Sequence, residues 1–345
     1  MRIIVDLMGG DHAPSELMRG VMEAAGKVNA SFILVGNVDE MRRIAAEHEY
    51  DLRRFDLVHT TDVVTMRDEP LAVMKQKREA SMFKGLQLLA DGEGDAFVST
   101  GNTGALFIGA TLIVRKIRGV QRAAIGAVLP AAAPLILLDT GANVVVSEEN
   151  LEQFAVMGSA YIRRIYGIEA PAVGLLNNGI EDQKGTPLQV KANADLRACP
   201  LISYVGNVEA SAAPFGVCNV LVTDGFTGNV FLKTMEGTGK YILRAFKKVF
   251  TENYRSKLSA LLVRGSLAEM KRTFDVSEYG GSPFLGISKP VVKAHGASDA
   301  HAFANAIRAA AEYAESGVIL DIADEIGRYT AFQKSQREGG GENDG

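Results

Sequence analysis

The sequence predicts an α/β protein with three layers, α/β/α, in which helices cover both faces of a mostly parallel, doubly wound sheet. Short apolar stretches typical of buried strands alternate with longer amphipathic stretches typical of helices. Glycine-rich polar turns follow several of the strands. With 345 residues, of which 47% are apolar and 23% charged, the composition suits a globular enzyme, and we expect a single catalytic domain over residues 1–336.

The first half of the chain alternates strands and helices. Ser15 is expected to cap a helix, because a serine hydroxyl can accept a hydrogen bond from an N–H of the first turn. A basic patch at 75–81 precedes another helix, and such charge runs are usually solvated faces. The predicted strands are 32–35, one within 55–70, 96–99 and a pair within 124–138; the predicted helices are 15–29, one from Asp39, one ending near Gly92 and 103–114.

The second half continues the alternation. The predicted strands are 172–176, 202–205, 220–222 and 290–294, and the predicted helices are 147–167, 187–198, 230–253, 299–316 and one at the C-terminus. Residues 337–345 are polar and rich in glycine, so we expect a disordered tail there.

Residues from about 240 to 275 form an excursion from this pattern. Leu258, Leu261 and Leu262 are interleaved with basic residues, which predicts short amphipathic helices with a basic rim. Their apolar side is expected either to contact an anionic membrane surface or to pack in a dimer interface or core. The sequence leaves both interpretations open.

The junctions between strands and turns carry the functional signal. The stretches 98–104 and 220–229 each run from an apolar strand through glycines and short polar residues into a helix, and looser versions occur near 3–11, 137–143, 204–207 and 291–296. Because parallel strands end at one edge of an open sheet, we expect these six loops to converge on one pocket rich in N–H groups. The candidate binding residues are Gly101, Asn102, Thr103, Gly104, Asn143, Asp224, Thr227, Gly228 and His295. His295 is alternatively a structural, hydrogen-bonded side chain.

Lys184 is the best candidate for a cation in this pocket. It lies on the loop 177–185, which follows a buried strand and also contains Asn177, Gly179 and Gly185. Most lysines on loops are merely solvated, but here the neighbouring amide and glycines favour an anionic ligand. A pocket with a lysine, many N–H groups and no side-chain nucleophile suggests that the substrate itself is the nucleophile, a role that inorganic phosphate fits.

Several classes of protein are disfavoured. A net charge of −4 argues against a general nucleic-acid binder, and Cys199 and Cys218 have no disulfide or metal-ligand spacing. The N-terminus lacks an export signal, and the apolar run 123–138 is too short and too broken by prolines to span a membrane, so we expect a cytoplasmic protein. No GxGxxG follows a strand and no GxSxG, HExxH or Walker A motif occurs, so we expect neither a nicotinamide or other cofactor nor a metal site.

Seven short motifs follow one another over roughly residues 1 to 320. They are Asp6-Leu-Met-Gly-Gly-Asp-His-Ala-Pro14, Ser99-Thr-Gly-Asn-Thr-Gly-Ala105, Leu138-Asp-Thr-Gly-Ala-Asn143, Val205-Gly-Asn-Val-Glu209, Thr223-Asp-Gly-Phe-Thr-Gly-Asn229, Tyr279-Gly-Gly-Ser-Pro-Phe-Leu-Gly286 and His295-Gly-Ala-Ser298. In this order they resemble the bacterial acyl-carrier-protein:phosphate acyltransferases of the PlsX type. The segments 210–212 and 288–289 depart from the usual pattern of that family.

The resemblance implies reversible transfer of a long-chain acyl group from acyl carrier protein to inorganic phosphate, which gives acyl phosphate for phospholipid synthesis. It also implies a fold like that of phosphotransacetylases and isopropylmalate dehydrogenases, and a cytoplasmic homodimer in peripheral contact with the membrane and its downstream glycerol-3-phosphate acyltransferase. We expect phosphate to attack the thioester directly, with Lys184 orienting phosphate and the Asn229 amide stabilising the oxyanion.

Other functions stay open at this level. The alternative enzyme is a phosphotransacetylase that uses acyl- or acetyl-coenzyme A; a metal-dependent decarboxylating dehydrogenase and a non-catalytic membrane scaffold are further rivals. An acidic carrier protein would need a basic surface, and the candidates are 115–118 with Arg122, 163–164 and 247–248. The sequence does not decide between these docking surfaces for the carrier protein, and it does not give the acyl chain-length preference or the regulation of the enzyme.

Overall fold

The computed structural model describes residues 1–274 and 276–340. Its strands are β1 (Arg2–Asp6), β2 (Ser31–Gly36), β3 (Asp56–His59), β4 (Ala96–Ser99), β5 (Ala124–Leu129), β6 (Leu135–Leu138), β7 (Ala172–Asn177), β8 (Ser203–Glu209), β9 (Val220–Val222), β10 (Ser282–Leu285) and β11 (Val291–Lys293). They form one sheet in the order β3-β2-β1-β4-β11-β10-β5-β6-β9-β7-β8. Most neighbouring strands are parallel, as predicted; the antiparallel pairs are β11 with β10, β10 with β5, and β5 with β6.

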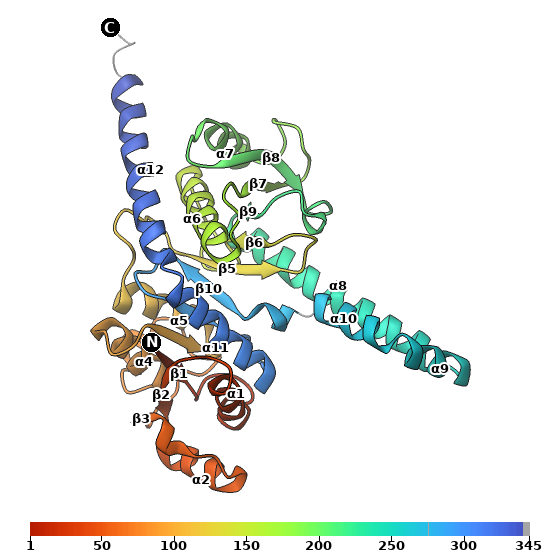
Figure 1. Cartoon of the computed structure of the whole chain (residues 1–345). Coiled ribbons are helices and arrows are strands. Elements are labelled where there is room, and N and C mark those ends of the chain that lie inside the picture. The colour runs from red at the N-terminus through yellow and green to blue at the C-terminus, as the bar shows by residue number, and fades with distance from the viewer. Residues whose placement is uncertain (275, 341–345) are drawn as a thin grey trace.

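Helices lie on both sides of this sheet (Figure 1). They are α1 (Ser15–Ala25), α2 (Val38–His48), α3 (Ala72–Lys75), α4 (Ser81–Asp91), α5 (Thr103–Gly109), α6 (Glu148–Tyr166), α7 (Pro187–Ala198), α8 (Gly225–Thr251), α9 (Tyr254–Leu262), α10 (Arg264–Phe274), α11 (Ala300–Glu315) and α12 (Val318–Gly340). Shorter turns are η1 (Leu52–Arg54), the π-helix η2 (Ala110–Val114), η3 (Ala213–Phe215) and η4 (Val276–Tyr279).

The inner strands are buried on both faces, which confirms the three-layer arrangement, whereas the edge strands β3 and β8 are partly exposed. In β1, Ile3 and Val5 join the core beneath α1, α6, α11 and α12, whereas Ile4 joins a separate core beneath α4 and α5. Successive side chains of a strand point to opposite faces, so this division places helices on both sides of the sheet. Farther along the second face, Leu137 and Leu221 pack near Phe231 of α8.

Strand β10 was not predicted, and it makes two of the three antiparallel pairings of the sheet. It is short, it follows Gly280-Gly281 and it begins with Ser282-Pro283, so no alternating apolar pattern marks it. Because β10, β5 and β6 alternate in direction, β6, β9 and β7 run opposite to β1, β4 and β11. The prediction that all six loops share one edge is therefore wrong, and the loops divide between the two ends of the sheet.

Several element boundaries differ from the prediction. Pro14, rather than Ser15, is the N-cap of α1, and no side chain caps that helix. Strand β8 continues to Glu209, because 204–207 pairs with β7 instead of forming a loop. Helix α8 begins at Gly225, five residues before the predicted 230, because Asp224 caps it.

The C-terminal boundary also differs. Helix α12 extends to Gly340, so the first part of the predicted disordered tail at 337–345 is helical. The rest of that prediction, residues 341–345, lies outside the described residues.

Helices α8, α9 and α10 form an arm that projects from the body of the molecule (Figure 1). This arm corresponds to the predicted excursion at 240–275. None of the residues of α9 is buried. Within residues 1–274 and 276–340, no helix combines the length and apolar character needed to cross a bilayer.

Candidate active site

The loops that follow β1, β4 and β11 meet at one end of the sheet, and we call them the first loop group. A Cβ added to Gly9 would lie 2.6 Å from the Cα of Gly101, so only glycine allows this approach. The Asp11 N–H donates to the carbonyl oxygen of Gly296 at 2.8 Å. Backbone packing of this kind fixes the three loops relative to one another.

Asp6, the last residue of β1, ties the first loop group together. Its carboxylate is 1% exposed and accepts hydrogen bonds from the Met8 N–H at 3.0 Å and the Ser99 hydroxyl at 2.7 Å. Burial raises the pKa of Asp6, and these hydrogen bonds oppose the rise.

The predicted binding residues at the start of α5 are largely engaged in holding this structure. Asn102 Oδ1 accepts from the Ala105 N–H at 3.1 Å, while its Nδ2 donates to the Asp68 carbonyl at 3.2 Å. The Gly101 N–H donates to the Ser99 hydroxyl at 3.0 Å. Asn102 and Gly101 therefore support the loop with the polar groups that were expected to bind a ligand.

The other two residues of this segment differ from each other. Gly104 packs on Pro70, since a Cβ there would lie 2.8 Å from the proline Cγ. Thr103 is exposed at the start of α5.

Two basic residues lie at the end of β11 and just beyond it. Lys293 is only 7% exposed, and its Nζ donates to the carbonyl oxygens of Thr100, at 3.2 Å, and Ala294. Burial lowers the pKa of Lys293 to about 8. His295 lies at the surface, its Nδ1 accepts from the Ala297 N–H at 3.2 Å, and desolvation lowers its pKa.

The loops after β6, β9 and β7 form the second loop group, and Asp139 is at its centre. This residue is fully buried and its carboxylate accepts from the N–H groups of Ile125 at 2.9 Å, Ala142 at 3.3 Å and Asn143 at 2.6 Å. Burial raises the pKa of Asp139, and the hydrogen bonds oppose that rise. Asp139 is not among the residues predicted to bind a ligand, although a carboxylate directly after four apolar residues is a usable signal.

Asn143 connects this loop to α8. Its Nδ2 donates to the Ala123 carbonyl at 2.8 Å and to the Asp139 carboxylate at 3.0 Å. Its own carbonyl accepts from the Gly225 N–H at 2.8 Å. Asn143, 5% exposed, is thus a structural link rather than a group open to a ligand.

The first turn of α8 packs tightly on the loop after β6. A Cβ on Gly228 would overlap the carbonyl oxygen of Asp139, so this position requires glycine. Asp224 caps the helix, because its carboxylate accepts from the Thr227 N–H at 2.8 Å and the Thr227 hydroxyl at 2.7 Å. Asp224, Thr227 and Gly228 therefore position the helix.

Asn229 is placed on this turn with a free side chain. It is exposed and lies over Gly141, since a Cβ on Gly141 would be 2.8 Å from its Nδ2. As the fifth residue of α8, Asn229 lies beyond the N–H groups that lack a helical acceptor, so only its side-chain amide is available. The Gly141 N–H beside it has no hydrogen-bond acceptor within the described residues.

Lys184 lies on the neighbouring loop after β7. Asn177 closes this loop by donating from Nδ2 to the Lys184 carbonyl at 3.0 Å. The lysine side chain is exposed and makes no ion pair or hydrogen bond among the described residues. Lys184 and Asn229 are at the same end of the sheet, because β7 and β9 are parallel neighbours with Leu175 opposite Val222.

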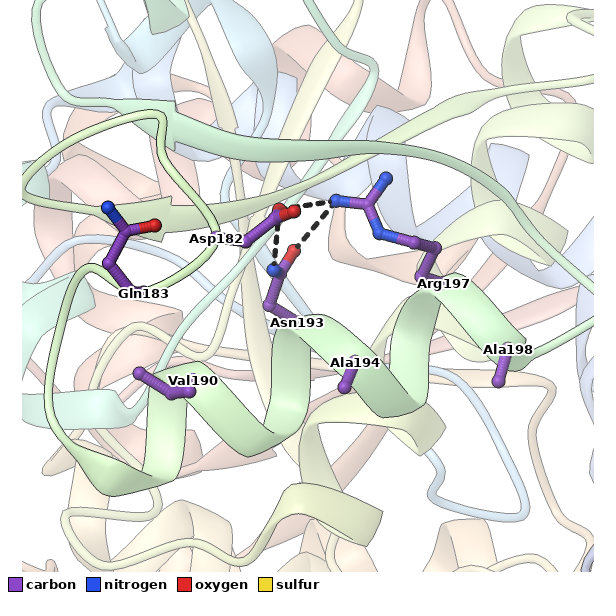
Figure 2. Close-up of a pocket in the computed structure, with 7 residues that line it drawn as sticks. All are labelled: Asp182, Gln183, Val190, Asn193, Ala194, Arg197 and Ala198. Carbon is purple, nitrogen blue, oxygen red and sulfur yellow. Dashed lines mark hydrogen bonds and ion pairs between the residues drawn. The ribbon is translucent and has the colours of Figure 1, made fainter.

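A polar cluster anchors the Lys184 loop to α7 (Figure 2). Asp182 accepts from Asn193 Nδ2 at 2.9 Å and from Arg197 Nη2 at 2.6 Å, and Tyr204 donates to Asn193 Oδ1 at 2.7 Å. The pocket between loop and helix is lined by Asp182, Asn193 and Arg197 together with Gln183, Val190, Ala194 and Ala198. The hydrogen bonds of Asp182, Asn193 and Arg197 hold the loop in place, and Lys184 does not line this pocket.

Helix α8 connects the two loop groups. It starts in the second group, and Lys233, one turn beyond Asn229, is close enough to His295 and Lys293 to lower the pKa of both, after the larger effect of burial. One turn rises about 5.4 Å. The first turn of α8 therefore belongs to the second loop group, and Lys233 brings a positive charge near the residues at the end of β11. Among residues 1–274 and 276–340, no three His, Cys, Asp or Glu side chains gather as a metal ion would require.

The fold and these glycine loops define an α/β/α protein with the architecture of the phosphotransacetylases. A phosphotransacetylase from Streptococcus pyogenes superimposes with a TM-score of 0.62 at 17% identity, covering 91% of this chain and 94% of that one. A branched-chain phosphotransacylase from Enterococcus faecalis V583 gives a TM-score of 0.56 at 15% identity, covering 91% and 99%. These similarities concern the fold alone, and they confirm the predicted fold class.

The chain belongs to the fatty acid synthesis protein family, whose model matches residues 1–321. It is 42% identical over 328 residues to the phosphate acyltransferase of Thermoanaerobacter pseudethanolicus (strain ATCC 33223 / 39E), which covers 94% of this chain and 97% of that protein. The family suggested by the seven motifs is thereby confirmed.

Proposed function

We propose that this protein is a phosphate acyltransferase that reversibly transfers a long-chain fatty acyl group from acyl carrier protein to inorganic phosphate. The product, an acyl phosphate, would serve phospholipid synthesis. The observation that carries this proposal is the 42% identity, over 94% of the chain, to a relative named phosphate acyltransferase. The choice of acyl carrier protein as donor rests on the seven motifs.

The reaction we propose is a direct displacement at the thioester. A phosphate oxygen attacks the acyl carbonyl carbon, the new C–O bond forms, the C–S bond breaks, and the carrier leaves as a thiolate that takes up a proton. Lys184 would neutralise and orient phosphate, while the Asn229 side-chain amide and the Gly141 N–H would donate to the oxyanion. Support comes from their availability: the side chains of Lys184 and Asn229 are exposed and free of hydrogen bonds within the described residues.

The remaining predicted binding residues act in this proposal mainly as supports. Asn143, Asn177, Asp224, Thr227 and Gly228 hold the second loop group in shape, and Gly101 and Asn102 do the same in the first. Thr103, Gly104 and His295, which lie in the first loop group, stay candidates for contact with another part of the substrate.

The test is an assay in which phosphate and palmitoyl-acyl carrier protein are incubated with the enzyme and acyl phosphate is trapped by hydroxylamine. We expect phosphate-dependent hydroxamate and free carrier thiol in equal amounts. Faster turnover of acetyl-coenzyme A than of the acyl carrier would favour the phosphotransacetylase alternative. Absence of both products would leave a non-catalytic role and would contradict the proposal.

We also propose a cytoplasmic homodimer in peripheral contact with the membrane, where it would meet the downstream glycerol-3-phosphate acyltransferase. The support is the apolar tip of the arm, in which Leu258, Leu261 and Leu262 are 54%, 62% and 81% exposed. Exposed leucines in a helix with basic neighbours suit the interface of an anionic bilayer.

A further inference from the structure

A basic turn at residues 115–122, between η2 and β5, lies beside the second loop group. Arg115, Arg118 and Arg122 are exposed, and none of them makes an ion pair or hydrogen bond through its side chain within the described residues. Unpaired guanidinium groups favour carboxylate partners, which they bind with two hydrogen bonds. On a chain with a net charge of −4, such a patch is where an acidic protein would be attracted.

The turn is rigid. Ile117 and Val120, 6% and 5% exposed, anchor it in the core. Lys116 Nζ donates to the Gln121 carbonyl at 2.6 Å, and the Gln121 N–H donates to Gln153 Oε1 at 2.8 Å. The arginines are therefore presented on a preformed surface, so less conformational entropy is lost when a partner binds.

The backbone leading into the turn is unusual. Helix α5 passes into the π-helix η2, and Arg115 then adopts a φ of 76°, which is rare for a residue with a side chain. Both features are enriched at functional sites, where surrounding structure maintains them. Here the Arg115 carbonyl accepts from the Ser288 N–H at 2.9 Å, and this bond helps to hold the strained residue.

The basic turn is joined directly to the candidate active site. Arg122 precedes Ala123, whose carbonyl accepts from Asn143 Nδ2 at 2.8 Å. The Asn143 carbonyl in turn accepts from the Gly225 N–H at the start of α8. A protein docked on the turn would thus be placed next to the loops that carry Gly141 and Asn229.

The other two basic clusters suit this role less well. Arg163 is paired with Glu325 at 3.0 Å and Arg164 with Asp321 at 3.2 Å, so both charges already have partners. Lys247 lies 18 residues beyond Asn229 on α8, which places it about 27 Å along the helix at 1.5 Å per residue.

We infer that the 115–122 turn is the docking surface for the acidic acyl carrier protein, with Arg118 and Arg122 contacting its carboxylates. This inference rests on the proposed function, in which that protein delivers the acyl thioester. The contact would bring the thioester to the second loop group while leaving the projecting arm free.

The test compares two double charge reversals of equal size, Arg118→Glu/Arg122→Glu and Lys247→Glu/Lys248→Glu. We expect the first to raise the KM for palmitoyl-acyl carrier protein at least about tenfold at low salt and to weaken its salt dependence, because charges at an interface steer association. Selectivity for the carrier over palmitoyl-coenzyme A should fall by the same factor. The second variant should retain the KM of the wild type.

The inference is overturned if the arginine variant keeps a normal KM for the carrier, or if the lysine variant raises that KM equally. An equal loss with palmitoyl-coenzyme A would also overturn it, since damage to the active site explains such a result. Failure of the proposed function looks different, because wild-type enzyme would then form no acyl phosphate. Binding of fluorescently labelled acyl carrier protein, measured by anisotropy, would still test the docking surface in that case.

Discussion

At the scale of single residues, the candidate site separates polar groups that build it from polar groups that remain free. Asp139 and Asn143 use their side chains in hydrogen bonds with neighbouring loops. Lys184 and Asn229 lie on the surface of that framework without side-chain partners in the described part of the chain. A developing oxyanion is stabilised by hydrogen-bond donors that are held on a fixed framework and have no other acceptor. Such donors need not reorganise during the reaction.

We therefore predict that Lys184→Ala and Asn229→Ala each lower kcat by roughly 100-fold or more, which is typical for removal of an oxyanion donor. Both side chains are exposed, so the thermal midpoint should change little. Gln183→Ala is the matched control, since this exposed neighbour of Lys184 lies on the same loop and should keep full activity. Turnover near the wild-type rate in either variant would remove that residue from the mechanism.

Lys293 offers a prediction about pH. Burial lowers its pKa in the folded protein from 10.5 to about 8. Between these values the unfolded chain holds a proton that the folded chain lacks, so the free energy of unfolding should rise with pH, by at most about 1.4 kcal/mol per unit. Below pH 8 this residue should contribute no slope.

Urea unfolding of the wild type and Lys293→Met from pH 7.5 to 10 measures this effect. Other titrating groups are common to both proteins, so the difference between their unfolding free energies isolates Lys293. We expect the free energy of unfolding of the wild type to increase relative to that of Lys293→Met as the pH rises. If the two proteins give parallel plots of unfolding free energy against pH, the pKa of Lys293 is not lowered by folding, and its amine is solvated.

At the scale of elements, α8 is the part of the fold on which the site depends most. Its first turn packs on the β6 loop without space for a side chain at Gly228, whereas a Cβ on Gly237 would meet nothing within 4 Å. We predict that Gly228→Ala destabilises the protein by about 1–3 kcal/mol through overpacking and lowers kcat by displacing Asn229. Gly237→Ala, on the same helix, should stabilise it by about 0.5–1 kcal/mol. Equal unfolding free energies would contradict the close packing.

The sequence predicts elements well where local chemistry specifies their ends. Helix α7 matches the predicted 187–198, because Pro187 occupies its first turn and Thr186 forms a capping box with Gln189. Strand β10 lacks such a signal and was missed. The role of Asp139 was also missed, since it depends on contacts with Ile125 and α8 that no local pattern encodes.

At the scale of the whole molecule, three antiparallel strand pairings decide how the loops are distributed. The fold class follows from the alternation of strands and helices, but the direction of each strand depends on long-range pairing. Because β10 pairs antiparallel with both β11 and β5, β5 runs parallel to β11, and the antiparallel pair of β5 and β6 then reverses the direction of β6, β9 and β7. The glycine loops therefore occupy two ends of the sheet, and α8 runs from the second loop group toward His295 of the first. The sequence therefore identified the loops but not their grouping.

The projecting arm gives the last prediction. Leu261, 62% exposed on α9, should enter the apolar layer of an anionic vesicle, so Leu261→Glu should abolish co-sedimentation with such vesicles. Leu320→Glu is the control, because Leu320 is 71% exposed on α12, away from the arm. Light scattering after size exclusion should give the same mass for both variants and the wild type. If Leu261→Glu instead converts a dimer to monomers, the exposed leucines form a subunit interface. The acyl phosphate would then have to reach the membrane without direct contact between the arm and the bilayer.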